Sequence, residues 1–287
     1  MAQQGQLHRR GGRPWRLAVY AADTLRAPAT LEAEVYSTQF VQAEAMRHAF
    51  EAFRRRWQRS GARACGGALV WQLNDCWPVA SWASLDYFGR WKALHYAAKR
   101  FYAPVLLSVE DDGTRMSIHV TSDLTQSWDG LVRWRLEDVT GNVIQSGEQR
   151  VTAKPLADTP VQAFDFADKI SDSNKRNSVF VAELWKDNEK IATSISCFAP
   201  IKHLALTDPR WEADVTLNNE ILMFNVSAKS LARFVELALD GVDAVFSDNY
   251  FDVPARTTVK ITAPLPSGWT LDQVKKALQV RSLIDSY

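Results

Sequence analysis

The run GGALVWQLNDCWP, residues 66–78, decides the fold class of this 287-residue chain. Its apolar part, residues 68–73, is short and nearly continuous, which is typical of a strand buried on both faces of a parallel sheet. Polar Asn74 and Asp75 mark the carboxyl end of that predicted strand.

Two helices are predicted around this strand. Apolar side chains recur at steps of three and four residues between Tyr36 and Trp57, which indicates an amphipathic helix. A second helix is predicted from about Arg90 to Tyr102, because Pro104 prevents its continuation. Helix, strand, long loop and helix together indicate an α/β segment.

The chain divides into four regions. Residues 1–33 are rich in Gly, Arg and Ala without a sustained period, which predicts an irregular lead-in. Residues 34–104 hold the α/β segment. Short alternating runs separated by turn signals then predict two antiparallel β-sandwiches, over residues 105–203 and 204–287. The clearest strand patterns are residues 116–120, 131–136, 179–185, 220–226, 234–239, 257–261 and 280–283, and residues 271–278 predict one short helical turn.

Composition excludes several classes of partner. The 34 basic residues nearly cancel the 33 acidic ones, which argues against nucleic acid or an anionic membrane. The three cysteines lack metal-ligand spacing, and neither a metal nor an organic cofactor is expected. No apolar run has the length of a signal peptide core or a membrane span, so the chain as written is expected in the cytoplasm. Eleven tryptophans indicate either a large aromatic core or a stacking surface for sugar rings or bases.

Several stretches resemble one enzyme family. Residues 66–101 closely resemble the segment that closes the (β/α)8 barrel of the β-mannosidases of glycoside hydrolase family 2, and the predicted helix over residues 36–55 fits that family too. FSDNYF, residues 246–251, and RSLIDSY, residues 281–287, resemble its C-terminal immunoglobulin-like domain. The resemblance implies a multidomain chain with an α/β part and an all-β part, in which a C-terminal barrel remnant precedes two immunoglobulin-like β-sandwiches.

The resemblance also implies a reaction, namely retaining hydrolysis of terminal non-reducing β-D-mannose from oligosaccharides. Such hydrolysis needs two carboxyl groups about 5 Å apart, which in this family are glutamates on the fourth and seventh barrel strands. Only the eighth strand is recognisable here, so both are expected upstream of Met1. The chain alone is then expected to be inactive, and a missing N-terminal part of the enzyme becomes a candidate partner. Asp75 and Asp86 form the only plausible pair of carboxylates within the chain.

The candidate substrate-binding residues are Trp71, Asn74, Asp75 and Trp77. An indole at the mouth of a barrel strand can stack on the apolar face of a hexopyranose, although a tryptophan in an apolar strand is also an ordinary core residue. In related barrel glycosidases this tryptophan often precedes a cis peptide. Asn74 and Asp75 either bond sugar hydroxyls or support the loop, and Trp77 lies in the loop where barrel enzymes concentrate substrate contacts.

A rival interpretation is a non-catalytic glycan- or protein-binding β-sandwich protein. Its sign would be an exposed row of aromatic residues on one sandwich face, for which Trp128, Trp134 and Trp185 are the candidates. An incomplete barrel would instead expose apolar surface, because it leaves Leu69, Leu73 and the inner face of the helix over residues 36–57 without neighbours.

Overall fold

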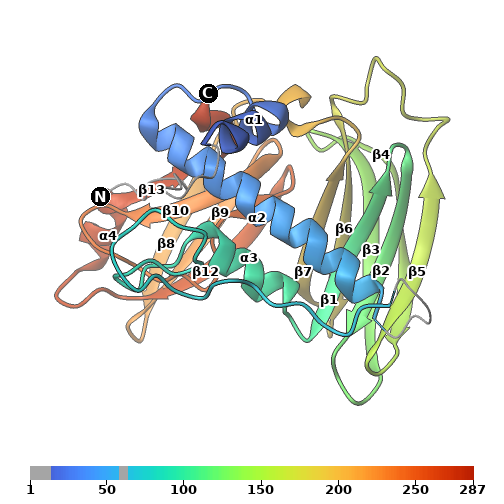
Figure 1. Ribbon diagram of the computed structural model, residues 1–287, viewed down its shortest axis with the longest axis horizontal. Helices are drawn as coiled ribbons and strands as arrows, with labels where there is room; N and C mark the ends of the chain where they lie inside the picture. Colours follow the sequence, from blue (N-terminus) through green and yellow to red (C-terminus); the bar gives the residue numbers. More distant parts are fainter. Residues whose placement is uncertain (1–13, 58–63) are drawn as a thin grey trace. The chain divides into compact units, whose positions relative to one another are not determined.

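The computed structural model describes residues 14–57 and 64–287 and divides the chain into two compact units (Figure 1). The first, called here the C-terminal unit, comprises Met1–Ala43, Trp71–Ala97 and Leu206–Tyr287. The second, called the central unit, comprises Glu44–Val70 and Ala98–Ala205. Each unit contains one β-sandwich, so the all-β part of the predicted architecture is confirmed.

The sandwich of the central unit is built from two antiparallel sheets. One has the strand order β1-β2-β5 and the other β4-β3-β6-β7. The bounds are β1 Val105–Asp112, β2 Arg115–Ser122, β3 Trp128–Asp138, β4 Val143–Ala153, β5 Ala157–Asp165, β6 Ser178–Lys186 and β7 Glu189–Cys197. Alternate residues of each strand point inward, so Ile118, Val132 and Phe180 meet in a core whose members are almost fully buried.

One close approach shapes this sandwich. Trp134 of β3 lies directly opposite Gly147 of β4. A Cβ atom at Gly147 would lie 2.7 Å from Cζ2 of the Trp134 indole, closer than real Cβ contacts. The indole therefore needs glycine on the neighbouring strand.

The sandwich of the C-terminal unit has the sheets β12-β9-β8 and β11-β10-β13. The bounds are β8 Glu212–Asn218, β9 Ile221–Ala228, β10 Ala232–Leu239, β11 Phe251–Val253, β12 Thr257–Pro264, α4 Leu271–Ala277 and β13 Leu278–Arg281; the short 3-10 helices η1 and η2 span Ile201–His203 and Leu283–Ser286. The predicted helical turn is therefore α4, whose Val274 packs into the core with Phe224 and Val235. Thr270 and Gln273 form a reciprocal capping box at its start.

Three helices accompany the sandwiches: α1 Pro14–Thr24, α2 Leu31–Arg55 and α3 Ala93–Phe101. Within the predicted irregular lead-in over residues 1–33, residues 14–24 instead form a helix and residues 31–33 begin α2, whereas residues 25–30 are irregular as predicted. The part of that prediction over residues 1–13 lies outside the described residues. Ala, Leu and Arg have high helix propensity even without an amphipathic period, and Pro14 suits a first helical turn. Hydrophobic periodicity alone therefore does not reveal this helix.

The inner face of α2 is not left without neighbours, so that prediction was wrong. In the C-terminal unit, the rings of Tyr36 and Phe40 pack edge-on against Phe234, with centroids 5.3 and 4.7 Å away. In the central unit, Phe50 stacks on Phe101 at 4.5 Å. Aromatic side chains of β10 and α3 thus bury the apolar face of the helix.

The predicted barrel strand over residues 68–73 does not appear as a strand. Among the described residues, the nearest β-bridge is an isolated one between Asn74 and Leu85, one residue beyond this stretch. A parallel strand needs hydrogen-bonded neighbours on both sides, and the described residues form no barrel sheet around this segment. The predicted exposure of its side chains is confirmed, because Leu69 is 94% and Leu73 60% exposed.

The described part of the chain contains no helix that is both long and apolar enough to span a bilayer.

Candidate functional site

The candidate site lies in the C-terminal unit, where residues 84–85 pair in parallel with residues 72–75. Leu85 N donates to Leu73 O at 2.8 Å, and Asp75 N donates to Leu85 O at 3.1 Å. Ser84 N donates to Gln72 O at 3.1 Å. These bonds hold residues 72–75 from one side, and the loop of residues 76–83 connects the two paired segments.

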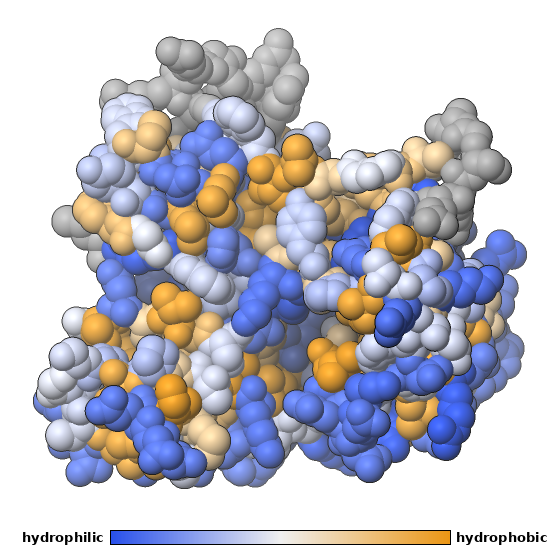
Figure 2. Space-filling model, turned by 90° about the horizontal axis from the view of Figure 1, so that it is seen from below, coloured by the Kyte–Doolittle hydropathy of each residue, from blue (hydrophilic) through white to orange (hydrophobic). Residues whose placement is uncertain are grey.

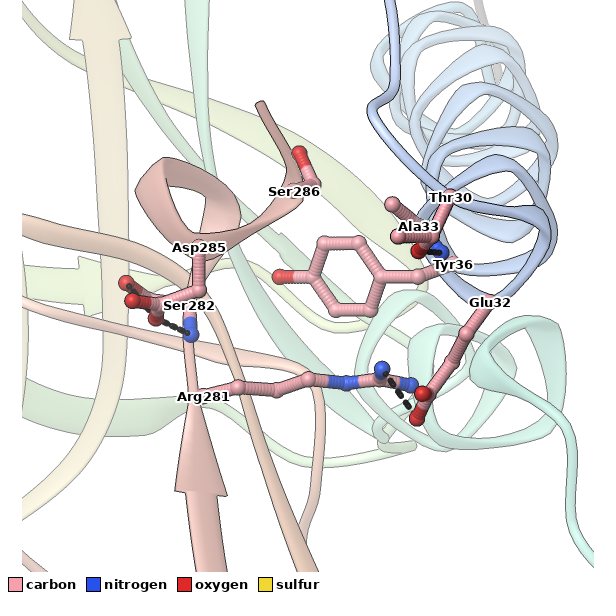
Figure 3. Close-up of a pocket in the computed structure, with 8 residues that line it drawn as sticks. All are labelled: Thr30, Glu32, Ala33, Tyr36, Arg281, Ser282, Asp285 and Ser286. Carbon is pink, nitrogen blue, oxygen red and sulfur yellow. Dashed lines mark hydrogen bonds and ion pairs between the residues drawn. The ribbon is translucent and has the colours of Figure 1, made fainter.

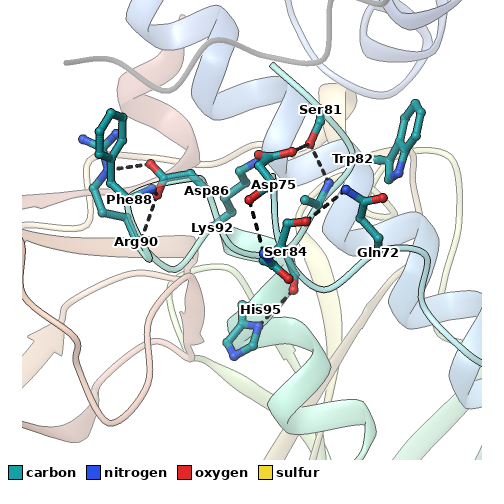
Figure 4. A network of polar contacts seen from close by, with 12 residues as sticks. Gln72, Asp75, Ser81, Trp82, Ser84, Asp86, Phe88, Arg90, Lys92 and His95 are labelled. Carbon is teal, nitrogen blue, oxygen red and sulfur yellow. Dashed lines mark hydrogen bonds and ion pairs between the residues drawn. The ribbon is translucent and has the colours of Figure 1, made fainter. Parts of the chain in front are cut away.

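A buried ion pair lies beneath this loop (Figure 4). Lys92 Nζ lies 3.0 Å from Asp75 Oδ2, and the two side chains are only 9% and 1% exposed. The Ser81 hydroxyl donates to the other carboxylate oxygen, Oδ1, in a short hydrogen bond. Ser81 Oγ in turn accepts from Ala83 N at 2.9 Å. Asp75 therefore connects the loop with the residue that precedes α3.

A second polar contact reaches the same segment from α3. Ser84 Oγ donates to Leu73 O at 2.8 Å and lies 3.0 Å from Nδ1 of His95. Burial lowers the pKa of the His95 imidazole, which favours its neutral form. A neutral ring with its proton on Nδ1 can donate to Ser84 Oγ while the hydroxyl donates to Leu73.

Asp86 organises the turn that follows. Its Oδ1 accepts from the backbone N–H groups of Phe88 and Arg90, each at 2.9 Å. Its Oδ2 accepts from Arg90 Nε at 2.5 Å. The carboxylates of Asp75 and Asp86 are thus each paired with a basic side chain and engaged in holding the loop.

The structure separates the four predicted site residues into two groups. Trp71 and Trp77 are 77% and 63% exposed, and Asn74 is also exposed. Asp75 is buried, and its carboxylate faces Lys92 rather than solvent. The peptide bond between Trp71 and Gln72 is cis, as the resemblance implied.

Several large apolar side chains of this loop are exposed. They follow one another at short intervals in the sequence: Trp71, Leu73, Trp77, Val79, Tyr87 and Phe88. On the face drawn in Figure 2, apolar residues are interspersed with polar ones. The exposed aromatic residues of the loop offer flat apolar surface.

A separate hollow of about 80 Å³ lies elsewhere in the C-terminal unit, beside Tyr36 and Arg281 (Figure 3). Arg281 pairs with Glu32 at 2.9 Å and also with Glu236. The Tyr36 hydroxyl donates to Phe234 O in a short hydrogen bond, and burial raises the pKa of this phenol well above its ordinary value. Ligand pockets usually enclose about 300–1,000 Å³, so this hollow is too small for a sugar ring.

Trp128, Trp134 and Trp185, in the sandwich of the central unit, do not form an exposed row. Trp134 is buried in the core. Trp128 alternates with it on the same face of β3, whereas Trp185 lies opposite Leu131 on the other face and beneath the guanidinium of Arg133. The sign expected for a glycan-binding sandwich is therefore absent from these residues.

Among these residues only Asp75 was predicted from the sequence as a site residue, whereas Lys92, His95, Ser81 and Ser84 were not. No spacing rule could have paired these residues. Their contacts depend on how the loop folds back, which a single sequence does not reveal.

The chain is similar to known mannosidases over most of its length. Residues 114–203 match the model of a mannosidase Ig/CBM-like domain, and residues 206–286 match the model of an Ig-fold domain of mannosidases. Beta-mannosidase B of Aspergillus niger is 34% identical over 271 residues, which is 88% of this chain and 31% of that protein. Beta-mannosidase B of Thermothelomyces thermophilus is 30% identical over 275 residues, 87% of this chain and 32% of the relative. The chain thus spans about a third of the length of these curated relatives.

Solved structures show the same fold. The β-D-mannosidase of Dictyoglomus thermophilum superposes with a TM-score of 0.83 at 22% identity, over 94% of this chain and 32% of that one. An exo-chitosanase of Amycolatopsis orientalis, in complex with a glucosamine derivative, superposes with a TM-score of 0.74 at 15% identity, over 98% and 37% of the two chains.

Proposed function

Because the chain belongs to the β-mannosidases of glycoside hydrolase family 2 and corresponds to their C-terminal region, we propose that it forms part of a retaining exo-β-mannosidase. In that enzyme, Trp71 is one wall of the pocket for the terminal non-reducing mannose. Trp77 contributes a second aromatic surface, and Asn74 offers an amide to sugar hydroxyls.

One observation carries the proposal: the indole of Trp71 is largely exposed while the backbone just after it is held by hydrogen bonds to residues 84 and 85. An exposed indole on a backbone that is held in place can stack on the C–H face of a pyranose, and its two side-chain torsions limit the conformational freedom lost on binding. Asp75 serves the site by holding the loop, which is the supporting role weighed for it from the sequence.

The catalytic carboxyl groups belong outside this chain in the proposal. A retaining glycosidase needs a free nucleophilic carboxylate and a second carboxyl group that gives and takes a proton. Asp75 and Asp86 are engaged with Lys92 and Arg90 and so suit neither role. The partner is a polypeptide segment that carries the remaining barrel strands and both glutamates.

The test uses a chimera in which residues 34–287 replace the matching segment of Aspergillus niger beta-mannosidase B. We expect the chimera to hydrolyse a chromogenic β-mannoside and Trp71→Ala to lower its kcat/KM about tenfold or more, because the stacking surface is lost. The 287-residue chain alone is expected to give no turnover. Turnover by that chain would overturn the placement of both carboxyl groups outside it, and an unaffected Trp71→Ala chimera would overturn the role of the indole.

A further inference from the structure

We infer that Lys92 is a positioning residue for the proposed mannose site, acting through its buried ion pair with Asp75 to hold the segment between Trp71 and Trp77. The inference rests on the proposed function, since it names the residue that keeps the stacking surface in place. Lys92 itself is buried, so its role passes through Asp75 and the loop.

The backbone at Lys92 is held by hydrogen bonds. Its own backbone N–H donates to Ser84 O at 3.0 Å, and the next N–H, that of Ala93, donates to Gln39 Oε1 of α2 at 3.0 Å. Gln42 Nε2, one turn further along α2, donates to Trp82 O at 2.9 Å. The ammonium group therefore projects toward the loop from a backbone that α2 holds in place.

Asp75 connects this fixed charge to the aromatic residues. It lies four residues after Trp71 and two before Trp77, and both of its oxygens are engaged, one by Lys92 and the other by Ser81. The path from Lys92 to either indole thus runs through one carboxylate and a few backbone bonds. Stacking tolerates displacements of only about 0.5 Å from the productive geometry, so small loop movements change affinity.

Removal of the ammonium leaves a carboxylate buried without its opposite charge. Such a carboxylate must either take up a proton or draw in water, and both outcomes displace the loop that surrounds it. The neighbouring pair of Asp86 and Arg90 differs, because the bonds of Asp86 close the turn formed by residues 86–90.

The experiment compares Lys92→Met and Lys92→Arg with Lys99→Met, which removes an exposed lysine from α3 and serves as the matched control. Hydrogen exchange in the 287-residue chain reports the amides of Asp75, Ser84 and Leu85. We expect Lys92→Met to speed their exchange at least tenfold, Lys92→Arg to restore most of the protection, and Lys99→Met to leave it unchanged.

A second readout links the loop to sugar binding. In the chimera, we expect Lys92→Met to raise KM about tenfold with a smaller change in kcat, because uniform binding of the sugar is what the loop provides. The double variant Asp75→Asn/Lys92→Met, which removes both buried charges, is expected to recover part of this loss.

The outcomes separate the two proposals. Faster exchange with an unchanged KM in Lys92→Met overturns the positioning role and leaves the proposed function intact. An unchanged exchange rate overturns the role of the ion pair itself. A chimera whose Trp71→Ala variant retains full activity overturns the proposed site, whatever the exchange data show.

Discussion

His95 is the residue whose protonation links the site to pH. Its Nδ1 lies 3.0 Å from Ser84 Oγ, and burial holds its pKa below the ordinary value of about 6.5. The unfolded chain therefore binds more protons than the folded chain in the window just below that value. Since stability rises with pH wherever the unfolded state binds more protons, the free energy of unfolding falls as the pH drops below about 6.5.

We therefore predict that His95→Gln makes the stability of the chain less dependent on pH. The wild type should lose more thermal stability between pH 7.5 and pH 5.5 than the variant does. Burial and the neighbouring Arg47 also lower the pKa of His48, so the variant should keep part of the pH dependence of stability. His203→Gln, at an exposed histidine, is the control, and equal losses in the wild type and His95→Gln would contradict the prediction.

At the scale of elements, the pairing of β3 with β4 requires a residue without a side chain at position 147. Trp134 and Gly147 are direct cross-strand partners, and a Cβ atom at position 147 would crowd the indole. We predict that Gly147→Ala lowers the free energy of unfolding of the central unit by about 1–3 kcal/mol, the usual effect of overpacking. Urea unfolding measures the change.

The controls for this prediction lie in the same strands. Ser146→Ala alters an exposed residue of β4 and should leave the unfolding midpoint nearly unchanged. Combining Gly147→Ala with Trp134→Phe replaces the crowded indole by a smaller ring, so the two changes together should cost less than the sum of their separate effects. Strict additivity would argue against steric crowding as the cause.

The elements that the sequence predicted well are those encoded locally. Residues 116–120 alternate between apolar and polar side chains and lie within β2, and the mostly apolar run of residues 179–185 lies within β6. The helical turn at residues 271–278 is present as α4. The strand over residues 68–73 failed for the opposite reason, because a parallel strand exists only through neighbours that the local pattern cannot supply. The same limit applies to the candidate site, where the resemblance could propose Trp71 but the sequence could not predict the contact between Lys92 and Asp75.

At the scale of the whole molecule, the chain carries unusual apolar exposure along residues 69–79. Large exposed apolar side chains are typical of surfaces that bind another protein segment or promote association. We predict that the isolated chain binds a hydrophobic dye strongly and that Leu69→Gln/Leu73→Gln reduces this binding more than Ile191→Gln does. Ile191 is also exposed but belongs to β7, in the sandwich of the central unit.

Dye fluorescence and sedimentation velocity measure this exposure together. We expect the double variant to sediment as a smaller average species at high concentration, because fewer apolar contacts are offered to a second molecule. A wild-type chain that binds little dye and stays monomeric would contradict the exposure of these side chains in solution.

The contact between Trp134 and Gly147 also has a consequence for inheritance. A lineage that keeps the indole has no neutral replacement for the glycine, whereas a lineage that has lost the indole is free to vary position 147. The two positions should therefore covary among homologous genes, with substitutions at the glycine arising after those at the tryptophan.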